Sequence, residues 1–153
     1  MRLKTILFST FLATAAALVF TACEKETEEV LVDNNLPQGA LTVTKMGSIT
    51  EQNGTGSKGS VKLGTDTKGV QFVQFGSDFQ TVLATGTVTV YLSTSQNYVA
   101  DPGNGNPNLK LIGIVQKNGE QFFKLDPKAD TKFTHLILWC GSANIPFGFT
   151  ALN

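Results

Sequence analysis

The sequence predicts an all-β protein with an antiparallel β-sandwich, for which a jelly-roll-like arrangement is one option. Three observations support this fold class. The chain is rich in Gly, Thr, Val and Phe, with 15 Gly and 11 Phe in total, and this composition favours strands separated by turns. Short segments show the strand period of two. No long stretch after position 40 has the 3.6-residue period of an amphipathic helix.

The segment 87–93 is the clearest strand. Val88, Val90 and Leu92 fall on one face, while Thr and Tyr side chains fall on the other. This period of two is typical of a half-buried strand. The other strands that we expect, in chain order, are Leu41–Met46, Ser60–Leu63, Val70–Phe75, Leu109–Val115, Gln121–Leu125, Phe133–Cys140 and Phe147–Leu152.

Two of these strands are apolar on both faces, the one with Ile112 and Ile114 and the one with Leu136–Trp139. Strands that are buried on both sides have this pattern. We therefore expect both to be central or covered strands.

Turn residues separate the expected strands. Asn53-Gly54 and Asn118-Gly119 are dipeptides of the hairpin type, because both residue types tolerate positive φ. Asp126-Pro127 and the segment 144–146, which ends in Pro, punctuate the later strands. Strands at this spacing predict one domain from residue 40 to residue 153.

The N-terminus has the features of a lipoprotein signal. Arg2 and Lys4 precede an uncharged segment, 5–22, which is rich in Leu, Phe and Ala and short for a membrane span. The segment 20–23, Phe-Thr-Ala-Cys, resembles a lipobox. We therefore expect a signal peptide at 1–22 and lipidation of Cys23. An ordinary cleaved signal with an incidental cysteine and an uncleaved anchor are the alternatives.

Residues 23–39 are expected to form the lipidated cysteine and an acidic tether. Four of the residues in 24–29 are Glu, and the 16 residues after Cys23 can reach about 50 Å when extended. The cluster resembles acidic export signals of surface lipoproteins in some Gram-negative bacteria, although a solvated linker explains it equally well. The sequence thus predicts an extracytoplasmic, lipid-anchored protein at the outer membrane or cell surface.

Charge and motifs exclude several classes of function. Cleavage before Cys23 leaves ten basic and twelve acidic residues, a net charge of −2, and removes Arg2, the single arginine. Without arginine or a basic patch, nucleic acid is not an expected partner. The chain has no phosphate-binding loop, HExxH or nucleophile motif, so a hydrolase is disfavoured.

The C-terminal half resembles the DM-thirteen domain family. The motifs that carry the resemblance are Tyr91-Leu92-Ser93, Leu111-Ile112-Gly113, Gly119-Glu120-Gln121-Phe122, Leu138-Trp139-Cys140, Phe147-Gly148 and Ala151-Leu152. The motifs are short, and it is their order that is specific. A histidine that the family commonly has near its first Gly-containing strand is missing around 55–59.

The resemblance implies a role in electron transfer at the cell surface. Cys140 is the candidate redox thiol, and Trp139, Phe147 and Gly148 are its supporting residues. A haem held by Cys140 is the cofactor that the family's proposed chemistry would allow, and the partner would be an unidentified redox protein. An enzyme of another kind is the third and weakest hypothesis.

The residues themselves also favour a different interpretation of Cys140. Leu136, Leu138 and Cys140 share one strand face, and a cysteine in such a place is commonly a core residue. The protein would then be a non-catalytic surface binding or adhesion domain. With Cys23 lipidated, no intrachain disulfide is possible, because the chain has two cysteines.

No metal site is expected from the sequence. The single histidine, His135, lies five residues before Cys140, so in a regular strand the two side chains point to opposite faces. There is no CxxCH motif, and Met46 as a second haem ligand has no supporting spacing. The loop 101–108 has one carboxylate, Asp101, and lacks EF-hand spacing. Trp139 is expected to pack against a neighbouring element.

Overall fold

The computed structural model describes residues 36–84, 86–99 and 105–153. These residues all belong to one compact unit of the chain. They form nine strands and no helix, so the predicted all-β class is confirmed. The predicted signal peptide, Cys23 and most of the predicted tether lie outside the described residues.

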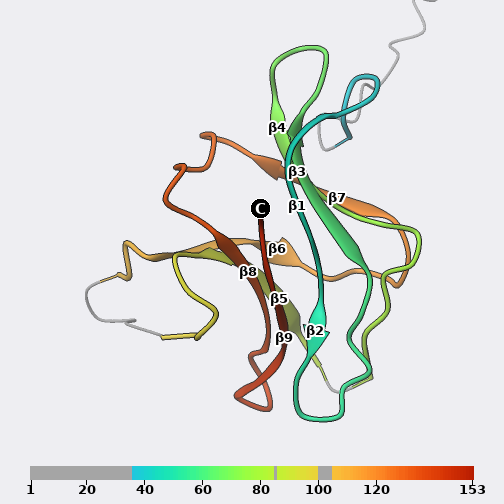
Figure 1. Cartoon of the computed structure of the whole chain (residues 1–153). Coiled ribbons are helices and arrows are strands. Elements are labelled where there is room, and N and C mark those ends of the chain that lie inside the picture. The colour runs from blue at the N-terminus through green and yellow to red at the C-terminus, as the bar shows by residue number, and fades with distance from the viewer. Residues whose placement is uncertain (1–35, 85, 100–104) are drawn as a thin grey trace, which may run out of the picture. The chain divides into compact units, whose positions relative to one another are not determined.

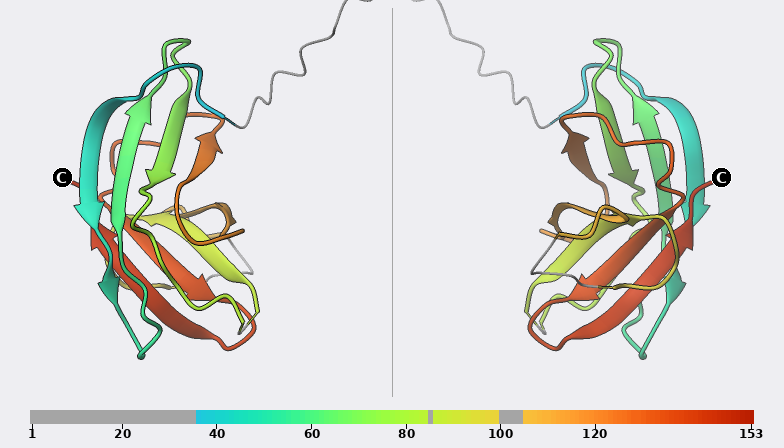
Figure 2. Two further views of the ribbon diagram at one scale, coloured as in Figure 1. Left: turned by 90° about the vertical axis from the view of Figure 1, so that its right-hand side faces the viewer. Right: turned by 90° about the vertical axis from the view of Figure 1, so that its left-hand side faces the viewer.

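The strands form two antiparallel sheets (Figures 1 and 2). The four-stranded sheet has the order β1-β3-β4-β7, with β1 at Thr42–Ser48, β3 at Ser60–Thr65, β4 at Gln71–Phe75 and β7 at Gln121–Leu125. The five-stranded sheet has the order β2-β9-β8-β5-β6, with β2 at Thr50–Glu51, β9 at Ile145–Ala151, β8 at His135–Cys140, β5 at Val88–Ser93 and β6 at Leu109–Ile114.

The chain passes between the sheets on both sides of the sandwich. On one side Ile49 separates β1 from β2, and Met46 and Asn153 exchange two backbone hydrogen bonds of 2.8 and 3.0 Å. On the other side the segment 115–120 connects β6 to β7. Gly119 has a φ of 85°, as a tight turn requires. Because β6 and β7 belong to different sheets, Asn118-Gly119 makes a turn between two sheets and not a hairpin within one.

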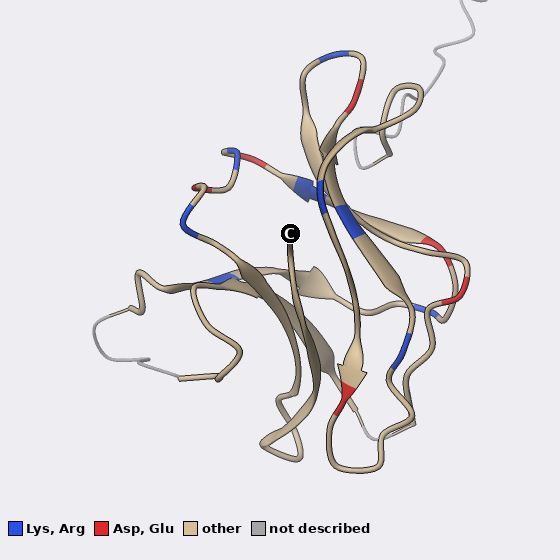
Figure 3. Ribbon diagram, viewed as in Figure 1, with Lys and Arg blue, Asp and Glu red and all other residues tan. Residues whose placement is uncertain are grey.

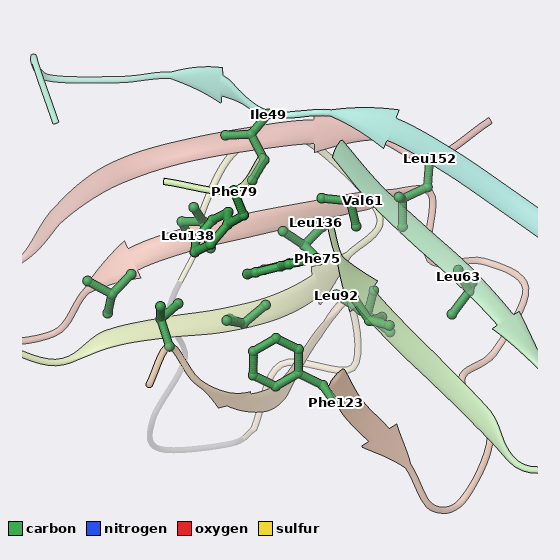
Figure 4. Packing of buried hydrophobic residues seen from close by; sticks show 14 of the residues in the cluster. Ile49, Val61, Leu63, Phe75, Phe79, Leu92, Phe123, Leu136, Leu138 and Leu152 are labelled. Carbon is green, nitrogen blue, oxygen red and sulfur yellow. The ribbon is translucent and has the colours of Figure 1, made fainter. Parts of the chain in front are cut away.

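Apolar side chains from both sheets fill the space between them (Figure 4). Phe75 lies at its centre, with ring centroids 4.3 Å from Phe79 and 5.1 Å from Phe123. Val88, Val90 and Leu92 all face this core, as the alternation in 87–93 predicts. Burial of each large apolar side chain contributes about 1.5–3 kcal/mol, which makes this core the main source of stability.

The expectation that both doubly apolar strands are central or covered is confirmed for β8 and wrong for β6. Strand β8 lies between β9 and β5, whereas β6 is an edge strand. A register shift in the β5–β6 pair turns Gly113 inward and leaves Leu111 and Ile114 outside, 55% and 44% exposed. A Cβ on Gly113 would lie 2.5 Å from the Phe123 ring. Close packing against β7 therefore sets the path of β6.

Strand β9 begins two residues earlier than predicted and includes Pro146. This proline pairs with Trp139 next to a register irregularity of the β8–β9 ladder. Proline is tolerated there because an irregular ladder does not need its missing N–H group. The short strand β2 was not predicted, since two residues carry no period.

Candidate functional site: Cys140 and the outer face of the five-stranded sheet

Cys140 is the last residue of β8 and lies in the core. Its side chain is 0% exposed and belongs to the same apolar cluster as Leu136 and Leu138. The sulfur has a polar neighbour, the Ser142 Oγ, at 3.3 Å. Ser142 belongs to the exposed turn 141–144 that joins β8 to β9. A thiol reacts only when it is accessible, so in this conformation Cys140 is placed as a packing residue.

The surroundings of Cys140 do not fit a haem. Its sulfur is enclosed by packed side chains, and Met46 is 55% exposed on an edge strand of the other sheet. His135 faces away from the core, with its Nδ1 2.9 Å from the Thr134 hydroxyl. Within the described part of the chain, no three His, Cys, Asp or Glu side chains gather as a metal site would require.

Phe147 and Gly148 have structural roles in β9. Phe147 is 1% exposed and is part of the core. A Cβ on Gly148 would lie 2.9 Å from the Thr50 carbonyl oxygen and 3.0 Å from Ile49 Cγ2. Gly148 thus allows β2 and Ile49 to pack closely on β9, and Phe147 is a core residue.

The outer face of the five-stranded sheet is apolar and aromatic. The strand registers align one row of side chains across it, Leu111, Tyr91, Ile137 and Phe149. Ile137 is 1% exposed although it faces away from the core, and it lies between Tyr91 and Phe149 of the neighbouring strands. Thr89 and Trp139 form a second aligned pair on the same face.

Three aromatic residues, Tyr91, Tyr98 and Trp139, pack together on this face, and we call them the aromatic cluster. Tyr98 comes from the loop after β5 and stacks on Trp139, with centroids 4.0 Å apart and planes 17° apart. It meets Tyr91 edge-on at 5.2 Å. Partial burial, followed by a hydrogen bond with Tyr91, raises the pKa of Tyr98 to about 12. Trp139 thus packs against a neighbouring element, as the sequence predicts.

Charged residues are sparse on the strands of this sheet (Figure 3), and none of the described ones has its side chain on the outer face. Charges occur on this sheet at Glu51 and Lys110. Glu51 pairs with Gly148, in line with Leu138, and Lys110 pairs with Leu92. Both positions are in register with core residues, so these two side chains belong to the inner side at the sheet edges. The Lys110 ammonium donates to the Pro127 carbonyl oxygen at 2.9 Å.

A cavity of about 320 Å³ lies beside the aromatic cluster, at the Ser93 end of β5. Its lining is mainly uncharged and polar: Ser93, Thr94, Ser95, Asn97, Asn106 and Asn108, with Val99 and Leu109. Asn106 shapes the loop, because its Nδ2 donates to the Val99 carbonyl oxygen at 2.6 Å and its Oδ1 accepts from the Asn108 N–H at 2.9 Å.

A second, more apolar cavity of about 530 Å³ lies where β6 and β7 diverge. Leu36, Ile114, Phe122 and Phe123 line it, together with polar and charged residues of the 115–121 region. Of these residues, Leu36 and Ile114 are half exposed, at 50% and 44%.

Sequence reasoning placed Trp139 correctly but missed Tyr98 and the cavity beside it. Tyr98 lies in a loop, where no period indicates what a side chain contacts. A usable signal was the distribution of charge: Asp101 is the single charged residue in 79–109, and 133–153 contains none. Both Asp101 and Cys23 lie outside the described residues.

No family model, curated protein or solved structure matches this chain. The described residues include no helix that is long and apolar enough to cross a membrane.

Proposed function

We propose that the protein is an extracytoplasmic lipoprotein whose β-sandwich is a non-catalytic binding module. The outer face of the five-stranded sheet is the contact surface, and Cys140 is a core residue. The observation that carries this proposal is the contrast between exposed apolar side chains on an uncharged face and a thiol that is 0% exposed.

The exposed apolar residues support a binding role. Leu111, Ile114 and Val99 are 55%, 44% and 60% exposed, and the first two lie on the same face as Tyr91. Soluble proteins expose large contiguous apolar patches mainly where they bind something. Lysine and acidic side chains, which usually keep a sheet face hydrated, are absent from the described part of this face.

The anchor is supported by the sequence of residues 1–39. The lipobox-like end at Cys23 provides an acylation site, and attachment through two or three acyl chains is stable where one chain is marginal. A tether of 16 residues would then hold the domain within about 50 Å of the membrane. A module held in this way would bring whatever it binds to the cell surface.

Electron transfer by a DM-thirteen-like domain is the second candidate. The order of the motifs around Trp139 and Cys140 supports it, and so does the place of Cys140 next to an exposed turn, with Ser142 Oγ 3.3 Å from the sulfur. Redox use would require the turn 141–144 to open. The two candidates therefore differ in whether a reagent reaches Cys140 in the folded protein.

Thiol labelling of the mature chain without Cys23 tests this difference. We expect a maleimide to label Cys140 only after denaturation, with one thiol modified per chain. The matched control is a Cys140→Ser, Ala143→Cys variant, whose thiol lies on the exposed turn and should be labelled at once. Labelling of Cys140 in the native state at a rate near that of the control would refute the core role and favour electron transfer.

Cys140→Ser alone gives a second readout. A hydroxyl in an apolar site costs about 1–3 kcal/mol, and the nearby Ser142 hydroxyl should keep the loss near the lower limit. Urea denaturation measures this loss. An unchanged free energy of unfolding would count against packing as the role of Cys140.

A further inference from the structure

The polar cavity and the aromatic cluster are built from neighbouring residues of β5 and of the loop that follows it. Asn97 lines the cavity, and the next residue, Tyr98, stacks on Trp139. Ser93 lines the cavity two positions after Tyr91, on the same face of β5. A molecule seated in the cavity would therefore lie beside aromatic rings.

We propose that this surface binds a neutral carbohydrate, with one sugar unit in the cavity and its neighbours along the aromatic cluster. The inference rests on the proposed function, since it names the class of molecule that the binding module takes. The cavity volume, about 320 Å³, is at the lower end of the usual range for small-molecule sites.

Carbohydrate chemistry matches both halves of the surface. A pyranose presents C–H groups on its flat faces, which pack on aromatic rings through the same quadrupole that orients aromatic pairs. Its rim carries hydroxyl groups that both donate and accept hydrogen bonds. Ser and Thr hydroxyls and Asn amides also do both, and they make up most of the cavity lining.

The described lining of the cavity favours a neutral ligand. Among the described residues, neither the cavity lining nor the aromatic cluster includes Lys, Asp or Glu. A uronic acid, a sulfated sugar or a phosphate would lose its hydration on this surface without gaining an ion pair, which is unfavourable. An acidic or basic protein surface would have no charged partner here either.

The two described ends of the loop that carries Tyr98 are fastened by hydrogen bonds, which reduces the entropy cost of ordering them on binding. The Thr94 N–H donates to the Asn108 carbonyl oxygen at 3.1 Å, and the Leu109 N–H donates to the Asn106 carbonyl oxygen at 3.1 Å. The Thr134 hydroxyl also donates to the Thr94 carbonyl oxygen at 3.3 Å, which ties the loop to the chain before β8.

Affinity electrophoresis of the mature chain tests the proposal. The probes are three neutral polysaccharides, hydroxyethyl cellulose, xylan and galactomannan, and the matched charged probe is carboxymethyl cellulose. We expect at least one neutral probe to retard the protein and carboxymethyl cellulose to retard it less than hydroxyethyl cellulose does. No retardation by any neutral probe, or stronger retardation by the charged one, overturns the proposal.

Variants locate the site. Tyr98→Ala should abolish the retardation, and an Asn97→Ala, Asn108→Ala double variant should weaken it about tenfold or more, because each amide is worth about one hydrogen bond. Both asparagines are exposed, so the double variant should fold even if Tyr98→Ala does not. The control is Phe122→Ala, a half-buried aromatic residue of the four-stranded sheet. Equal retardation of the double variant and the control overturns the proposal.

Sedimentation at several concentrations separates the competing occupant. A dimer that Leu111→Lys dissociates, with no polysaccharide binding, would show that a second copy of the chain covers this face and would overturn the carbohydrate proposal. Thiol labelling distinguishes a failure of the carbohydrate proposal from a failure of the binding-module proposal. If Cys140 stays protected while no probe binds, the carbohydrate proposal fails and the binding-module proposal stands.

Discussion

The outer faces of the two sheets bury an apolar residue in different ways. On the four-stranded sheet, Phe72 is 1% exposed outside the core cluster, and Leu41 packs over Gly64, its partner in β3. On the five-stranded sheet, Ile137 is equally buried, but between Tyr91 and Phe149 of the neighbouring strands. One face is covered by the start of the domain, whereas the other is covered by aromatic side chains.

The two outer faces also differ in the charged residues that they carry. Lys62 and Lys124 lie on the outer face of the four-stranded sheet, in register with Gln74 and Phe72. Asp66 fastens the covering segment, because its Oδ2 accepts a 2.9 Å hydrogen bond from the Gln38 N–H. The outer face of the five-stranded sheet has no such anchor among the described residues. Charged side chains keep the uncovered part of the outer face of the four-stranded sheet hydrated. The outer face of the five-stranded sheet is uncharged and aromatic and exposes Leu and Ile, which suits it to the binding role that we propose.

The largest expected effect contrasts the shared core with the aromatic face. Phe75→Ala should lower the free energy of unfolding by about 3–5 kcal/mol, since it leaves a cavity between Phe79 and Phe123. Leu111→Ala, on the exposed edge strand, should change it by no more than about 0.5 kcal/mol. Urea denaturation measures both. A loss of 2 kcal/mol or more in Leu111→Ala, on the order of a core substitution, would mean that β6 is not an exposed edge.

A smaller effect concerns the covered face and depends on pH. Hydrogen bonds from the backbone, first that of Gln38 and then those of Val70 and Lys68, lower the pKa of Asp66 below its ordinary value of 3.8. The lowered pKa stabilises the fold above pH 3.8, and this stability is lost as the pH falls through the folded-state pKa. Asp66→Asn should therefore melt at a lower temperature than the native protein at pH 7.

The control for Asp66 is a melting series from pH 7 to pH 2. The gap between Asp66→Asn and the native protein should close as the carboxylate is protonated in both the folded and unfolded states. The same substitution should leave the thiol of Cys140 protected, because it loosens the other sheet. A gap of constant size across the series would contradict the assigned role of the carboxylate.

The smallest effect is spectroscopic and concerns the aromatic cluster. Burial and the Tyr91 hydrogen bond raise the pKa of Tyr98 to about 12 from 10.0, so the phenol should ionise late in an alkaline titration followed at the phenolate absorbance. Tyr91→Phe removes the hydrogen bond and should lower that pKa, while burial keeps it above 10. The raised pKa stabilises the fold below pH 10 and is lost as the pH rises through about 12.

The outcome that would contradict the cluster is early ionisation. If the phenol of Tyr98 titrates near pH 10 in the folded Tyr91→Phe variant and in the native protein alike, Tyr98 is not packed on Trp139. The surface proposed for carbohydrate would then lack its aromatic half.

Much of the fold was predictable from local pattern. The period of two in 87–93 identified the buried face of β5, and the face shared by Leu136, Leu138 and Cys140 predicted their place in the core. The candidate site was less predictable. Asn97 and Tyr98 lie in a loop, and the position of Tyr98 depends on its stacking on Trp139, which is about forty residues away in the chain.

The sequence by itself determined which side chains of a strand share a face, because alternation is a property of the extended backbone and needs no partner. Only the tertiary structure decided which strands lie at an edge, because that depends on pairing between distant segments. Thus β8 is central and seals Cys140, whereas β6, with a similar composition, leaves Leu111 and Ile114 exposed. Those exposed residues and the loop that places Tyr98 on Trp139 form the uncharged face for which we propose a binding role.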